Sequence, residues 1–179
     1  MPKSTGEMRR ESATAKTVSG VFPPKGQPPV LPVETKKERV NMISALNGQG
    51  EVRYALYEDS MNQQRLIMFM RNLIRTSTKK VFLILDNLKV HHGKKVAEWV
   101  SRHQDKIRLF FLPPYAPESN PDEYLNHALK LSVHSGELPV NRLDIRHKTN
   151  SFMRTLQRNN DSVLAFFRHP SISYAFIQK

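Results

Sequence analysis

Two acidic residues in this sequence have types and positions suited to metal chemistry. Asp86 directly follows the apolar run VFLIL (81–85), and Glu123 follows a proline-rich segment; residues 87–122 separate the two acids. Ligands in open α/β sheets bind beyond the carboxyl ends of strands, so Asp86 would face a crevice. Magnesium and manganese ions prefer carboxylate ligands and water. Asp86 and Glu123 therefore predict a shared Mg²⁺ or Mn²⁺ site.

Each acid also has a simpler structural interpretation. Asp86 and Asn87 would begin a turn, because both residue types bond their own backbone. Asn120 and Glu123 have the spacing of a capping box, in which the glutamate side chain bonds the amide of the cap residue. The helix dipole also favours a carboxylate in the first turn. Asp122 would lie on another face of this helix and point to solvent.

The composition favours a basic globular protein with a polyanionic partner. Of the 179 residues, 39% are hydrophobic, and the net charge of +12 favours nucleic acid as the partner. A basic protein that binds no nucleic acid is the alternative. The chain has no cysteine and no apolar run of transmembrane length, which predicts a cytoplasmic protein without a membrane partner. His91 and His92 would contact a phosphate or a carboxylate, or simply lie at the surface.

Apolar periodicity and turn residues predict alternating strands and helices. Strands are expected at 38–45, 51–57, 81–85 and 108–112, and helices at 63–76, 94–103, from Pro121, at 142–157 and at 161–168. The strand at 81–85 has no polar residue, so we expect it to be buried on both faces. The order strand, helix, strand from 81 to 112 implies a parallel pair with a right-handed crossover.

Two motifs resemble those of a known family. LILDNLKVHH (83–92) and PPYAPESNPDE (113–123) are similar to the DDE-type transposase family, in its bacterial insertion-sequence branch related to mariner elements. The resemblance runs from about Phe22 to Phe176. It implies an α/β, RNase H-like fold with a central mixed sheet flanked by helices. It also implies a catalytic Asp, Asp, Glu triad in which Asp86 is the second acid and Glu123 the third.

The chain departs from the family pattern at its beginning. The family's first aspartate ends the first sheet strand, whereas here the corresponding region reads MPKSTGEMRRES and offers only Glu7 and Glu11. Asp59 lies after a later strand and is not a replacement. We therefore expect a loosely attached or disordered segment at 1–21 and a catalytic domain at 22–179 that lacks its first strand. Loss of that strand would leave a neighbouring sheet edge unpaired, in a chain that is marginally stable or associates.

The resemblance implies a metal-dependent enzyme that cuts a phosphodiester at the ends of its own element and joins the freed 3′ hydroxyl to target DNA. The family usually acts as a dimer or larger assembly. The alternative is a catalytically inactive remnant that binds only DNA or partner subunits. A third possibility is an unrelated basic α/β binding protein in which Glu123 is only a cap. No DNA-binding residues are assigned from the sequence.

Overall fold

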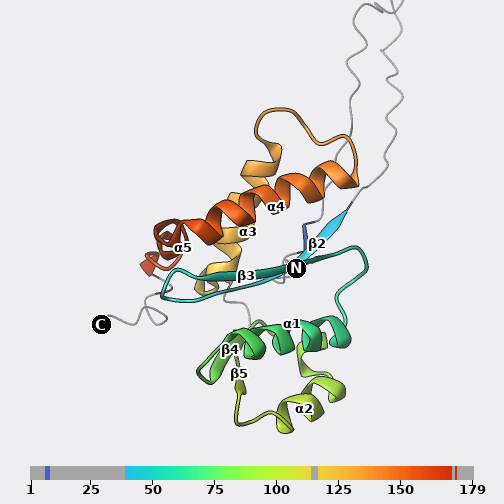
Figure 1. Ribbon diagram of the computed structural model, residues 1–179, viewed down its shortest axis with the longest axis vertical. Coiled ribbons are helices and arrows are strands. Elements are labelled where there is room, and N and C mark those ends of the chain that lie inside the picture. Colours follow the sequence, from blue (N-terminus) through green and yellow to red (C-terminus); the bar gives the residue numbers. More distant parts are fainter. Residues whose placement is uncertain (1–6, 9–38, 114–116, 171, 173–179) are drawn as a thin grey trace, which may run out of the picture.

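The computed structural model describes residues 7–8, 39–113, 117–170 and 172, which form two small sheets and five α-helices (Figure 1). One sheet contains β1 (Glu7–Met8), β2 (Val40–Leu46) and β3 (Val52–Tyr57), all antiparallel to their neighbours. The other pairs β4 (Val81–Leu85) with β5 (Ile107–Phe111) in parallel. The helices are α1 (Gln63–Thr76), α2 (Lys94–Ser101), α3 (Pro121–His134), α4 (Arg142–Arg158) and α5 (Asn160–Ala165), with 3₁₀ turns η1 (Lys89–His92) and η2 (Pro117–Ser119).

The β2–β3 hairpin closes through a turn that the sequence predicted. The Asn47 side-chain oxygen accepts hydrogen bonds from the amides of Gln49 (3.1 Å) and Glu51 (2.9 Å). Gly50 has φ of +83°, a backbone conformation that favours glycine. This turn fixes the register in which Leu46 lies opposite Val52.

Helix α1 has the predicted bounds and lies beneath the hairpin. Asn62 caps it by accepting a hydrogen bond from the Arg65 amide at 2.9 Å. The buried face of α1 belongs to a core that also takes residues from both sheets and from α2. Its members are Ile43, Tyr57, Leu66, Ile67, Phe69, Met70, Leu83, Val96, Trp99 and Ile107.

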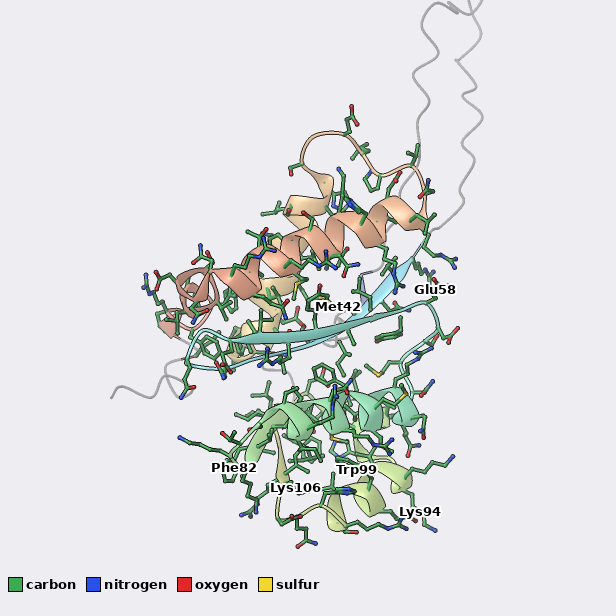
Figure 2. All side chains as sticks on the ribbon, viewed as in Figure 1. Met42, Glu58, Phe82, Lys94, Trp99 and Lys106 are labelled. Carbon is green, nitrogen blue, oxygen red and sulfur yellow. The ribbon has the colours of Figure 1, made fainter. Side chains whose placement is uncertain are left out.

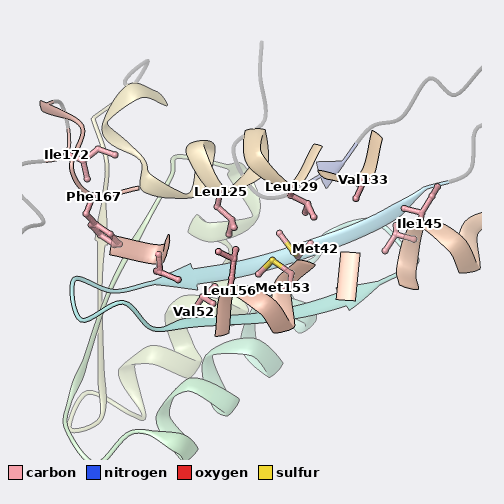
Figure 3. Close-up of a cluster of buried hydrophobic side chains, with 12 residues drawn as sticks. Met42, Val52, Leu125, Leu129, Val133, Ile145, Met153, Leu156, Phe167 and Ile172 are labelled. Carbon is pink, nitrogen blue, oxygen red and sulfur yellow. The ribbon is translucent and has the colours of Figure 1, made fainter. Parts of the chain in front are cut away.

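A second core lies on the other face of the hairpin, under α3 and α4 (Figure 3). Met42 from β2 meets Leu125 and Leu129 from α3 and Met153 from α4 in this core. The hairpin is therefore covered on both faces, by α3 and α4 on one side and α1 on the other (Figure 1). This packing places the first turn of α3, with both of its acids, beside β2.

The prediction that β4 is buried on both faces is wrong. Leu83 is buried beneath α1 and α2, but Phe82 is 62% exposed and Ile84 is 46% exposed. Phe110 of β5, the register partner of Ile84, is also exposed. The helices α1 and α2 cover one face of this sheet, and the other face stays open within the described residues. The apolar composition of β4 shows that the strand is hydrophobic, but it does not show whether other elements cover both of its faces.

The strands do not form one central sheet in the described part of the chain. Among the described residues, the edge of β2 that faces away from β3 pairs only with β1, through Glu7 opposite Asn41 and Met8 opposite Val40. The β4–β5 pair forms a separate sheet with the predicted parallel arrangement. Residues 1–6 and 9–38 lie outside the described residues, so the proposed domain boundary after residue 21 remains a prediction. No helix in the described ranges is long and apolar enough to cross a membrane.

We predict that the open face of the β4–β5 sheet drives self-association. Replacing Phe82 and Ile84 together by serine should lower the apparent mass at high protein concentration, because the change removes exposed apolar area from one sheet face. Sedimentation velocity over a range of concentrations measures this. The control is Leu131→Ser with Leu143→Ser, two exposed leucines on α3 and α4. Equal effects of the two double variants would contradict the prediction.

Candidate metal-binding and catalytic site

Asp86 directly follows β4, and its side chain is only 13% exposed. Its Oδ1 atom accepts a hydrogen bond from the Leu88 amide at 3.2 Å, so Asp86 does begin a turn as one interpretation expected. The same oxygen lies 2.9 Å from Nδ1 of His91. The turn and the histidine together hold the carboxylate in one orientation at the carboxyl end of the strand.

His91 is buried, with 1% of its surface exposed, and is part of this site. Its Nδ1 atom lies within hydrogen-bond distance of both Asp86 Oδ1 and the Asp86 carbonyl oxygen, at 2.9 and 3.0 Å. Its Nε2 atom is buried and has no hydrogen-bond partner in the part of the chain that the structure describes. His92 is exposed and stacks on Phe111. The expectation of a surface position therefore holds for His92 and fails for His91.

Glu123 lies in the first turn of α3, but it does not form the expected capping box. The Asn120 side chain caps the helix by accepting a hydrogen bond from the Asp122 amide at 3.1 Å. Among the described residues, the buried Oε1 of Glu123 has no hydrogen-bond partner. Burial raises the pKa of Glu123, Lys130 lowers it, and the negative charge of Asp86 raises it further. An ionised Asp86 therefore disfavours ionisation of Glu123.

Asp122 points inward, so the expectation that it faces solvent is wrong. Oδ1 of Asp122 accepts a hydrogen bond from the Ser44 hydroxyl of β2, and Oδ2 accepts one from the Asn126 amide at 3.4 Å. Burial raises the pKa of Asp122 to about 7, the two hydrogen bonds oppose this rise, and Glu123 and Asp86 add to it. The sequence contained one signal for this inward position of Asp122. Ser44 is a polar residue on the same face of β2 as the buried Met42, so it needs a polar partner there.

The arrangement suits a hard divalent cation in part. Asp86 and Glu123 are two carboxylates, and the charge of Asp86 raises the pKa of Glu123. Within residues 39–113, 117–170 and the short described segments, no three His, Asp or Glu side chains are placed to hold a metal ion together. A cation held by the predicted pair would therefore take two protein ligands and complete its coordination with water.

The described strands and helices form an α/β arrangement with two small sheets flanked by helices. The family described as DDE superfamily endonuclease matches residues 9–146, well over half of the chain. The chain therefore belongs to this family. The predicted family resemblance and the RNase H-like fold class are both confirmed.

Solved structures of a mariner transposase share the fold. The Mos1 catalytic domain is 15% identical with a TM-score of 0.53, over 79% of this chain and 76% of that one. A pre-cleavage Mos1 transpososome gives 13% identity and a TM-score of 0.56, over 89% of this chain and 52% of that one. The Mos1 paired end complex with Mn gives 15% identity and a TM-score of 0.54, over 98% of this chain and 54% of that one. This chain thus aligns with about half the length of the transposase in those assemblies. No curated protein sequence was found to match it.

The raised pKa of Asp122 predicts a stability that falls with pH. The folded state keeps a proton up to about pH 7, whereas an unfolded aspartate releases it near pH 4. The free energy of unfolding should therefore decrease from about pH 4 to about pH 7 and level off above. Asp122→Asn, which keeps acceptors for Ser44, should flatten this slope in denaturant titrations with EDTA. Asp105→Asn controls for the loss of one exposed acid, and an unchanged slope in Asp122→Asn would contradict the assignment.

His91 should stabilise the fold through its contact with Asp86. His91→Asn keeps a donor near the position of Nδ1, whereas His91→Leu removes it. The leucine variant should be less stable than the asparagine variant by about 1.5–3 kcal/mol, the typical contribution of a hydrogen bond to a charged group. Equilibrium denaturation of the two variants measures the difference. Equal stabilities would mean that the contact contributes nothing beyond packing.

Proposed function

We propose that this chain is the catalytic domain of a DNA transposase, which cleaves a phosphodiester at the ends of an insertion sequence and transfers the freed strand. Asp86 and Glu123 are the proposed catalytic and metal-binding residues. The observation that carries the proposal is the buried Oε1 of Glu123, which has no hydrogen-bond partner among the described residues and lies under the electrostatic influence of Asp86. A carboxylate oxygen buried without a partner is costly for a purely structural residue and useful for a cation ligand.

Different contacts orient the two carboxylates that would hold such a cation. The Leu88 amide and His91 orient the Asp86 carboxylate, while the packing of α3 on β2 positions Glu123. A bound Mg²⁺ or Mn²⁺ would supply charge neutralisation at the reacting phosphate and a more acidic attacking oxygen. The choice of these ions is supported by structures of the Mos1 catalytic domain with Raltegravir and Mg or Mn.

DNA is the proposed partner, together with a second copy of the chain. The net charge of +12 favours a polyanion. The structurally similar Mos1 chains come from a pre-cleavage transpososome, a strand transfer complex and a paired end complex. The proposed place of action is the cytoplasm, where a bacterial element would meet its DNA.

A remnant that binds DNA or partner subunits without cutting is the second candidate. It is favoured by the lack of a third metal-ligating acid among the described residues and by the short pairing of β1 with β2. The two candidates agree on DNA binding. They differ on whether two protein carboxylates are enough to hold a working cation.

The deciding experiment is nicking of supercoiled plasmid in Mn²⁺. The intact chain should nick DNA, and Asp86→Asn and Glu123→Gln should each lower the rate by about a hundredfold or more, the typical scale for loss of one electrostatic stabiliser of a transition state. Glutamine preserves the size of the Glu123 side chain while removing its charge. Glu118→Gln, an exposed acid just before α3, is the matched control.

The outcomes separate the two candidates. Nicking that persists unchanged in both site variants would refute the assigned roles. Absence of nicking by the intact chain, with DNA binding preserved, would establish the binding remnant instead.

A further inference from the structure

A basic hollow lies at the end of the β4–β5 sheet opposite Asp86. A cavity of about 560 Å³ opens where β4 and β5 begin, and Asp105 is the acid in its lining. A larger neighbouring hollow of about 1210 Å³ shares residues 77–80 with it and adds Arg53 and Glu51. The cationic side chains of the first cavity come from α1, the α1–β4 loop and the start of β5, and are Arg71, Arg75, Lys79, Lys80 and Lys106.

The basic hollow is this first cavity together with the five cationic side chains that line it. The five side chains are exposed and have no ion-pair partner within the described ranges. Other cations of the chain do find acids: Arg65 pairs with Asp59, and Arg142 with Glu58. Helix α1 contains no acidic residue, and Arg71 and Arg75 lie one turn apart on it. Like charges at this spacing destabilise a helix slightly, so the fold itself does not require the arrangement.

The helix dipole explains only part of this cluster. A cation in the last turn of a helix is favoured, which accounts for Arg75 near the end of α1. Lys79, Lys80 and Lys106 lie outside that turn, yet they face the same cavity. Their convergence from separate segments indicates a surface suited to an extended anion rather than to the end of one helix.

The distance from this hollow to the acids fits duplex DNA. Lys80 directly precedes β4 and Asp86 directly follows it, so six residue steps separate them by about 20 Å at roughly 3.3 Å per residue. About six base pairs span that length, at roughly 3.4 Å per base pair. Lys94, the first residue of α2, is well separated from Lys106 (Figure 2). One duplex could therefore touch both ends of β4.

We propose that the basic hollow binds the phosphate backbone of the DNA duplex about six base pairs from the bond held at Asp86 and Glu123. This inference rests on the proposed function, since it takes the DNA to be the transposase substrate. The contact would be independent of base sequence, because exposed lysines and arginines read phosphates and not base edges. It would fix the duplex relative to the acids without taking part in the chemistry.

The salt dependence of DNA affinity tests this contact. Arg71→Gln with Arg75→Gln removes two charges from exposed positions one turn apart on α1. Arg154→Gln with Arg158→Gln removes two charges with the same spacing and exposure on α4. Fluorescence anisotropy with a 20-base-pair duplex, at several salt concentrations, should show the slope of log affinity against log salt falling by about 1.8 for the α1 pair. The α4 pair should leave the slope almost unchanged.

The outcomes are distinct from those of the nicking experiment. Equal slope changes in both pairs would overturn the proposal, since they would show that diffuse charge drives binding. No slope change in the α1 pair, or no DNA binding by the intact chain, would overturn it as well. Binding that depends on Arg71 and Arg75 in a chain that does not nick would support the basic hollow while the catalytic proposal failed. Circular dichroism of each variant verifies folding.

Two further experiments, phosphate competition and cross-linking, identify the ligand. Inorganic phosphate at millimolar concentration should not displace the duplex, because a single anion engages only part of the hollow; full displacement would indicate a free-phosphate site instead. The chain contains no cysteine, so Lys106→Cys introduces a unique thiol. This variant should cross-link, by thiol–disulfide exchange, to a duplex whose phosphate carries a tether ending in an activated mixed disulfide. Arg158→Cys should not cross-link, and the reverse pattern would contradict the proposal.

Discussion

Packing of helix α1 is the constraint on which the relative position of the acids depends. Asp86 follows β4, whereas Asp122 and Glu123 lie on α3, which packs against β2. Among the described residues, no strand pairing joins the β4–β5 sheet to the sheet that contains β2. Side-chain burial around α1 joins them instead, with Ile43 and Tyr57 contributed by one sheet and Leu83 and Ile107 by the other. The geometry of the site is thus held by packing rather than by a continuous ladder of backbone hydrogen bonds.

The two acids of α3 illustrate how hydrogen bonding separates a structural carboxylate from a ligand. Both have raised pKa values, because burial and neighbouring negative charge disfavour ionisation of each. Asp122 receives hydrogen bonds from Ser44 and Asn126, which compensate its burial. Oε1 of Glu123 is buried and receives no such bond from any residue that the structure describes. The uncompensated acid is the one that gains most from a bound cation.

The sequence predicted element positions better than it predicted side-chain surroundings. Helix α1 and strand β4 have the expected bounds, because a cap residue and a continuous apolar run mark them locally. Exposure of Phe82 was missed, since coverage of a sheet face depends on distant segments. The sequence also could not tell His91 from His92, because the two adjacent histidines differ only in which one the turn after Asp86 directs inward.

For the acids of α3, local patterns were misleading in a specific way. Asn120 and Glu123 have capping-box spacing, but the Asn120 side chain bonds the Asp122 amide, and the packing of α3 on β2 turns the Asp122 side chain toward Ser44. A helix start can satisfy its first amides with either pattern, so spacing alone does not decide between them. Contact with β2 decides it here. The same contact that directs Asp122 toward Ser44 also positions Glu123 in the first turn of α3, and so one packing arrangement determines the surroundings of both acids.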